Sequence, residues 1–114
     1  MTNNHENVAI QFIKGKNELN NPEIRLFRNH DGKKGYAVYK FNNPTTITPE
    51  NFKSIKKMYL IDEEGELTTR KIDLSISENN INGVTSTYHW KSEQEFERFI
   101  RFAKRYANMS TNTN

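Results

Sequence analysis

The chain of 114 residues contains no cysteine, which excludes disulfides and thiolate chemistry and fits a reducing compartment. It also lacks any apolar run near the roughly 20 residues that a membrane-spanning helix requires. Its first residues, MTNNHENVAI, show no basic start followed by an apolar stretch, so no secretory signal is expected there. Only 33% of the residues are hydrophobic. We therefore expect one small core of aromatic and β-branched side chains.

Alternating or continuous apolar segments predict that much of the chain forms β-strands. The candidate strands span residues 8–13, 24–28, 36–41, 58–61, 67–76 and 84–90. Residues 36–41 (YAVYKF) are apolar at odd and even positions, which predicts a central strand buried on both faces. Between Leu67 and Ile72 the apolar positions change from odd to even, which requires a bulge or a change of environment.

Turn signals join these strands into hairpins. Residues 29–35 (NHDGKKG) contain two glycines and predict a turn between two strands. Glu64-Gly65 is where the strand at 58–61 reverses. Asn82-Gly83 is a strong two-residue hairpin signal, because both residue types tolerate positive φ, and Asn79-Asn80 is a competing turn.

Residues 92–107 (SEQEFERFIRFAKRYA) predict an amphipathic helix that completes the fold. Ser92 and Glu95 have the spacing of a capping box. The expected apolar stripe consists of Phe96, Phe99, Ile100, Ala103, Tyr106 and Ala107. A short helix is also expected near residues 49–57, after a Thr48 N-cap and a proline.

Strands followed by one packed helix indicate an α+β domain, with an antiparallel sheet of about five to six strands packed against the C-terminal amphipathic helix. We expect a flexible N-terminus at residues 1–7, a single domain at 8–107 and a flexible C-terminal tail at 108–114.

The net charge is +3, and much of the basic excess falls in the first 40 residues, which suggests an acidic partner. The alternative is that lysines keep a small sheet soluble and protect its edges. The first candidates for partner binding are Arg25, Arg28, Lys33 and Lys34. The second group comprises Arg98, Arg101 and Arg105, which fall opposite the apolar stripe of the helix.

No catalytic, cofactor or metal site is expected. The four carboxylates of the segment DEEGE at residues 62–66 are too tightly grouped for a twelve-residue calcium loop, so a solvated turn is the preferred interpretation. The three histidines are scattered without metal spacing, and neither a nucleophile elbow nor a glycine-rich phosphate loop is present.

A small basic RNA-binding α+β module is the alternative from another class. It would use aromatic residues interleaved with basic ones for stacking and phosphate contact, although the RNP signature is absent. The aromatic residues concerned are Phe12, Phe27, Tyr36, Tyr39 and Phe41.

Several segments together resemble the photosystem II accessory protein family Psb28, from about Ile10 to Ala107. They are IQF at 10–12, PEIRLFR at 22–28, GYAVYKFNNP at 35–44, MYLIDEEGEL at 58–67 and ERFIRFAKRYA at 97–107. The strand with its acidic turn and the final helix are the specific ones. Phe96 and Glu93 stand where the family's tryptophan and proline are expected, which leaves the lineage open.

The resemblance implies a protein of photosynthesis that is not an enzyme and has no cofactor. It would be a peripheral membrane protein that binds immature photosystem II transiently, on the cytosolic side of the thylakoid membrane in a cyanobacterium or the stromal side in a plastid. Its implied partners are the inner antenna subunit and the reaction-centre core proteins, and its implied role is assembly or repair. No nucleic acid is expected as a partner.

Overall fold

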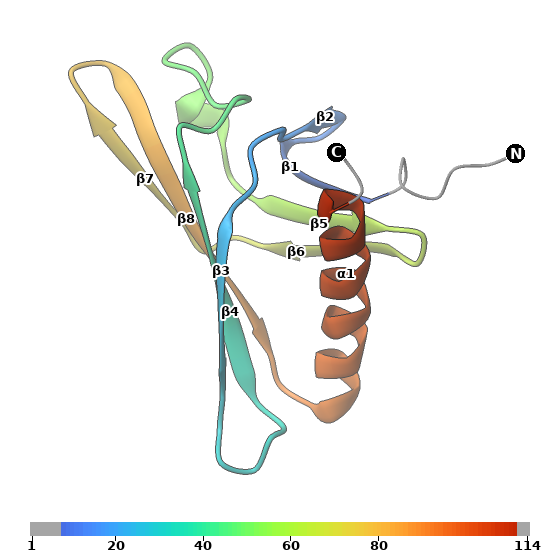
Figure 1. Ribbon diagram of the computed structural model, residues 1–114. Coiled ribbons are helices and arrows are strands. Elements are labelled where there is room, and N and C mark those ends of the chain that lie inside the picture. The colour runs from blue at the N-terminus through green and yellow to red at the C-terminus, as the bar shows by residue number, and fades with distance from the viewer. Residues whose placement is uncertain (1–7, 112–114) are drawn as a thin grey trace, which may run out of the picture.

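The structure, a computed structural model, describes residues 8–111 as two four-stranded antiparallel sheets and one long helix (Figure 1). The first sheet has the order β2-β1-β5-β6, with β2 at Lys16–Asn17, β1 at Ala9–Ile13, β5 at Met58–Asp62 and β6 at Gly65–Thr69. The second has the order β3-β4-β8-β7, with β3 at Glu23–Arg28, β4 at Gly35–Asn42, β8 at Asn80–Trp90 and β7 at Ile72–Ser77. Helix α1 spans Glu93–Thr111, and a short 3-10 helix, η2, spans Phe52–Ser54.

The predicted α+β class is confirmed, but the described strands number eight and form two sheets instead of one sheet of five to six. The difference has two sources. The two-residue strand β2 is too short to give a sequence pattern. The segment predicted as one strand at 67–76 is divided between β6 and β7.

Arg70 and Lys71 form the corner where the chain passes from the first sheet to the second. The corner is fastened to β8: the Thr69 hydroxyl donates to the Thr87 carbonyl at 2.6 Å, and the Thr87 amide donates to the Lys71 carbonyl at 3.1 Å. A strand that changes sheets also changes which of its faces is buried. The change of apolar parity therefore reflects a change of environment, one of the two expected causes, although the passage to a second sheet was not predicted.

Strand β4 is central in its sheet, but only one of its faces is buried. Ala37, Tyr39 and Phe41 are fully buried, whereas Tyr36 and Lys40 on the alternate positions are exposed. The prediction of burial on both faces was wrong, because the helix and the first sheet cover only the inner face of the second sheet. The outer face of β4 is open.

The turn between β7 and β8 lies at Glu78 and Asn79, which both have positive φ, 51° and 66°. The prediction of a turn at Asn82-Gly83 was wrong. Strand β8 continues through this dipeptide and pairs with β4 as far as Gly83 opposite Asn42. A turn there would have removed the β7–β8 pairs that lie beyond it.

Helix α1 begins as predicted: the Glu95 amide donates to the Ser92 hydroxyl at 3.1 Å. It runs to Thr111, four residues past the expected end at Ala107. The ring of Phe99 in this helix stacks on the rings of Tyr88 and Trp90, with ring centres 5.5 and 5.2 Å apart. These contacts seat the helix against the inner face of the second sheet.

Residue Phe102, which the predicted stripe omitted, is also fully buried, whereas Ala107 of that stripe is exposed. The division into a domain at 8–107 with flexible ends stays a prediction, and the N-terminal segment 1–7 lies outside the described residues.

Candidate docking surfaces

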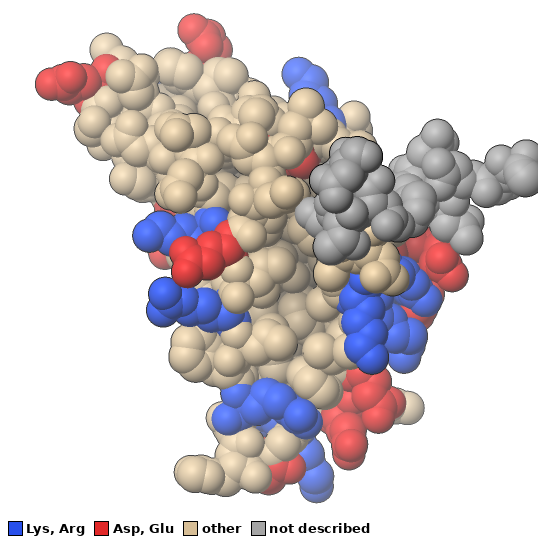
Figure 2. Space-filling model, viewed as in Figure 1, with Lys and Arg blue, Asp and Glu red and all other residues tan. Residues whose placement is uncertain are grey.

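The three helix arginines proposed for partner binding are engaged within the fold. Arg98 donates from both terminal nitrogens to Asp62, at 2.8 and 2.9 Å, and Arg105 donates to the same carboxylate at 2.8 Å. Arg101 forms a two-bonded pair with Glu64, at 2.7 and 2.9 Å. The arginines of α1 therefore bind the acidic turn between β5 and β6. Basic and acidic groups meet on the α1 side of the molecule in Figure 2.

Asp62 is the centre of this network, because its side chain is 0% exposed. Burial by itself raises the pKa of Asp62, but hydrogen bonds from Arg98, Arg105 and the Glu64 amide outweigh it, so the pKa lies below its ordinary 3.8. Hydrogen bonds from Arg101 and Arg105 lower the pKa of Glu64 to about 2. The turn thus anchors the helix through Asp62 and Glu64, while residues 63–66 are exposed to solvent, as the sequence suggested.

A second buried carboxylate, Glu18, fixes the loop that leads into β3. It is 5% exposed and accepts hydrogen bonds from the amides and hydroxyls of Thr45 and Thr46, at 2.8 to 3.0 Å, and from the Asn20 amide at 3.1 Å. Burial raises the pKa of Glu18, but these donors outweigh it and hold the pKa below 4.5. The start of β3 is therefore held in place by satisfied polar contacts.

The four candidate cations around β3 and its turn differ in availability. Arg25 forms an exposed pair with Glu23 at 3.3 Å. Arg28 donates to the Gly32 carbonyl and lies 3.8 Å from the centre of the Phe96 ring, where the cation faces the π-system. Lys33 and Lys34 are exposed and form no ion pair with another residue of the described range 8–111.

Of the five aromatic residues considered for RNA stacking, Phe12, Tyr39 and Phe41 belong to the buried core. Phe27 and Tyr36 are 43% and 37% exposed on the outer face of the second sheet, with ring centres 4.9 Å apart. Most of the proposed stacking platform is therefore unavailable, and the structure gives no support to the RNA-binding alternative.

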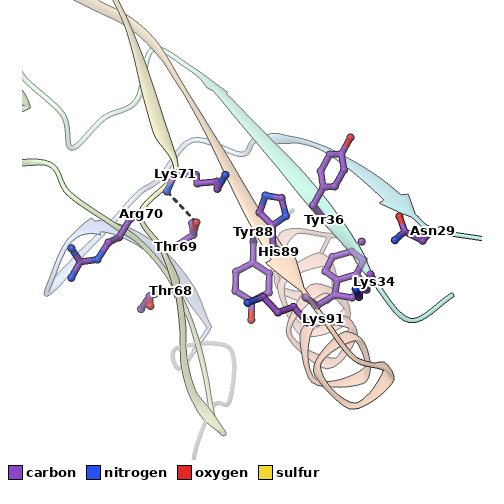
Figure 3. A pocket seen from close by; sticks show the side chains of 12 residues that line it. Asn29, Lys34, Tyr36, Thr68, Thr69, Arg70, Lys71, Tyr88, His89 and Lys91 are labelled. Atoms are coloured by element: carbon purple, nitrogen blue, oxygen red, sulfur yellow. Dashed lines mark hydrogen bonds between the residues drawn. The ribbon is translucent and has the colours of Figure 1, made fainter. Parts of the chain in front are cut away.

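A cleft of about 780 Å³ lies between the corner at Arg70–Lys71 and the end of β8 (Figure 3). Residues from three separate segments line it. Four of them are basic: Lys34, Arg70, Lys71 and Lys91. Only Lys34 was among the predicted candidates. The sequence signal for Arg70 and Lys71 was the change of apolar parity beside them, which marks the corner but not the cleft.

Among residues 8–111, no group of three or more histidine or acidic side chains is arranged to hold a metal ion. No helix in this range has the length and apolarity to cross a membrane. The expectations of no catalysis and no cofactor stay predictions.

The fold and its surfaces define a small α+β domain whose exposed features are strand edges and a basic cleft. Comparison with known proteins identifies its family: the model described as Psb28 protein matches residues 10–112. A "Photosystem II reaction center Psb28 protein" of Prochlorococcus marinus (strain NATL2A) is 68% identical over 108 residues, which cover 95% of this chain and 96% of that protein. One of the same name from Synechococcus sp. (strain CC9605) is 46% identical over 100 residues, 88% of this chain and 79% of that protein.

This chain belongs to the Psb28 protein family, as the resemblance in its sequence indicated.

Replacing Asp62 by Asn should lower the free energy of unfolding by about 2–4 kcal/mol, because two arginines lose a buried partner. Glu66→Gln is the matched control in the same hairpin: within residues 8–111, Glu66 forms one ion pair, with Lys14 at 2.8 Å on an exposed surface, and should matter little. Urea unfolding of both variants measures the difference. Equal stability of the two would contradict the anchoring role of Asp62.

Lowered carboxylate pKa values also predict how stability depends on pH. A group whose pKa is lower in the folded chain stabilises the fold above its unfolded pKa, and the contribution is lost as the pH falls through the folded value. Because Asp62 and Glu18 both have lowered pKa values, stability should be nearly constant from about pH 5 to pH 7 and should fall below about pH 4. Asp62→Asn should make the fall shallower when unfolding is measured across this range. A fall of unchanged steepness would argue against Asp62 as its source.

Proposed function

We propose that this protein is a non-catalytic photosystem II assembly or repair factor that binds immature photosystem II transiently. It acts on the cytosolic face of the thylakoid membrane, or on the stromal face in a plastid, near the inner antenna subunit and the reaction-centre core. Its attachment to the membrane is peripheral and passes through protein contacts. Support comes from the relatives, which are named photosystem II reaction center proteins.

The observation that carries the docking mechanism is the free edge of β3. All six residues of this strand are exposed, and it pairs with β4 on one side only. The ladder registers Arg28 with Gly35, and the adjoining Asn29 amide donates to the Lys34 carbonyl at 2.8 Å. The backbone N–H and C=O groups of successive residues in an antiparallel strand point alternately toward and away from the paired strand. Those of Ile24, Leu26 and Arg28 therefore point away from β4. These groups are available to an added strand.

The other sheet edges are less suited to accept a strand. Strand β2 has two residues, and the β7–β8 ladder shifts register between Ser75 and Ile76. Short strands and bulges are the features by which proteins protect sheet edges. Strand β6 ends at the corner, where the chain is fastened to β8. Strand β3 has neither protection and is the favoured receiving edge.

Electrostatic attraction is a second proposed contribution to docking. Arg25, Lys33 and Lys34 lie on β3 and in the turn that follows it, beside the receiving edge, and all are exposed. Acidic loops of a partner would be attracted to these cations, which speeds encounter and makes it sensitive to salt. The helix arginines are a weaker expectation, since carboxylates of the same chain already bind them.

The test is a comparison of Leu26→Pro with Leu26→Ala. Both remove the exposed leucine side chain, but only proline removes an amide that points to the free edge. The β3–β4 ladder should persist in both. Leu26→Pro should weaken recovery of tagged protein with immature photosystem II by about tenfold relative to Leu26→Ala, because main-chain bonding at the edge is lost.

Melting temperatures of the two variants serve as the control for folding. Equal recovery of the two variants would exclude β3 as the receiving edge. Failure of the native chain itself to co-purify with photosystem II from solubilised photosynthetic membranes would contradict the proposed function as a whole.

A further inference from the structure

The cleft beside the corner concentrates positive charge from distant parts of the sequence. Lys34 comes from the β3–β4 turn, Arg70 and Lys71 from the β6–β7 corner, and Lys91 from the residue after β8. All four side chains are exposed. No carboxylate lines the cleft, and none of the four forms an ion pair within the described part of the chain. Asp31 lies near Lys34, and Asp73 lines a neighbouring hollow together with Arg70 and Lys71. Because the cleft itself is lined by four cations and no carboxylate, it favours an anionic ligand.

Exposed aromatic rings continue from the cleft across the outer face of the second sheet. Tyr36 and His89 line the cleft, and their ring centres are 5.4 Å apart. Phe27 on β3 continues this row: its ring stacks on that of Tyr36, with ring centres 4.9 Å apart. In Figure 3 the labelled Tyr36 and His89 project from adjacent strands on the same side. Aromatic rings beside cations are typical of surfaces that lie at a membrane–water interface.

The kinds of cation present distinguish a membrane surface from a carboxylate of another protein. At the turn between β5 and β6, two arginines bind carboxylates of this chain in two-bonded pairs, Arg98 with Asp62 and Arg101 with Glu64, whereas the exposed lysine pair Lys14–Glu66 has a single contact. Three of the four cleft cations are lysines, which act as flexible point charges without a fixed fork for a carboxylate. Flexible point charges suit a layer of phosphate groups whose positions vary.

We propose that this cleft and its aromatic row are a second contact surface, which binds the phosphate-bearing headgroups of an anionic membrane. It adds direct lipid contact to a protein proposed above to be held at the membrane by protein contacts alone. The site shares Lys34 with the proposed charged docking surface and reaches Phe27 on β3, but it uses none of the outward backbone groups of that edge, and the lipid contact does not require photosystem II. Its failure would therefore leave the docking proposal intact.

The test measures partition of the full chain onto vesicles of phosphatidylglycerol mixed with phosphatidylcholine, and onto phosphatidylcholine alone. The variant Arg70→Gln/Lys71→Gln removes two charges from the cleft. Lys16→Gln/Lys56→Gln removes two exposed charges that do not line it. The cleft variant should lose about 30-fold in partition onto the anionic vesicles. The control should lose less than about threefold. Melting temperatures confirm that both variants are folded.

Four results would overturn the proposal. An equal loss in both variants, or no preference of the native chain for anionic vesicles, would indicate no lipid site. Release from vesicles by inorganic phosphate, but not by chloride at equal ionic strength, would assign the cleft to a free oxyanion. Normal vesicle binding of the cleft variant with reduced recovery of photosystem II would assign the cleft to an acidic segment of that complex.

Discussion

One helix has to cover two sheets, and this constraint determines which surfaces of the protein are exposed. Phe99 of α1 packs against aromatic rings of the second sheet, and Phe102 is fully buried in the same core. Burial of each such side chain contributes about 1.5–3 kcal/mol. The helix reaches only the inner faces, so the outer face of β4 and the edge of β3 remain open to solvent.

The ion pairs between α1 and the β5–β6 turn complement this packing. Asp62 is the last residue of β5 and Glu64 lies in the turn that follows, and the arginines that bind them lie 36 to 43 residues later in the chain. The network orients the helix along the first sheet while the aromatic rings hold it to the second. It also occupies the charges that would otherwise give the helix a basic outer face. The cations proposed to bind partners lie instead near β3 and around the cleft, where Lys33, Lys34, Arg70, Lys71 and Lys91 are exposed.

The local elements of this fold were predictable from the sequence, because their signals are local. The capping box at Ser92 gave the start of the helix, and the parity change before Ile72 indicated a bulge or a change of environment, although not the passage to a second sheet. The turn at Asn82-Gly83 was predicted wrongly, because pairing with β4 extends the strand through a dipeptide that suits a turn in isolation.

The docking surfaces were less predictable, because they depend on which segments meet. Helical periodicity placed Arg98 on the polar face but could not show that Asp62 lies opposite it. Likewise, Lys34 was a candidate by charge alone, whereas its neighbours Arg70 and Lys91 are brought to the same cleft only by the arrangement of the two sheets. Neither helical periodicity nor charge points to photosystem II, and the family resemblance supplied that biological context.

Hydrogen exchange of single backbone amides, with and without immature photosystem II, tests the docking mechanism most directly. In the free protein the amides of Ile24, Leu26 and Arg28 should exchange rapidly, since they face solvent, while Arg25 and Phe27 are already protected by β4. Binding should protect the first three selectively. Protection of α1 with no change at these amides would contradict strand addition at β3.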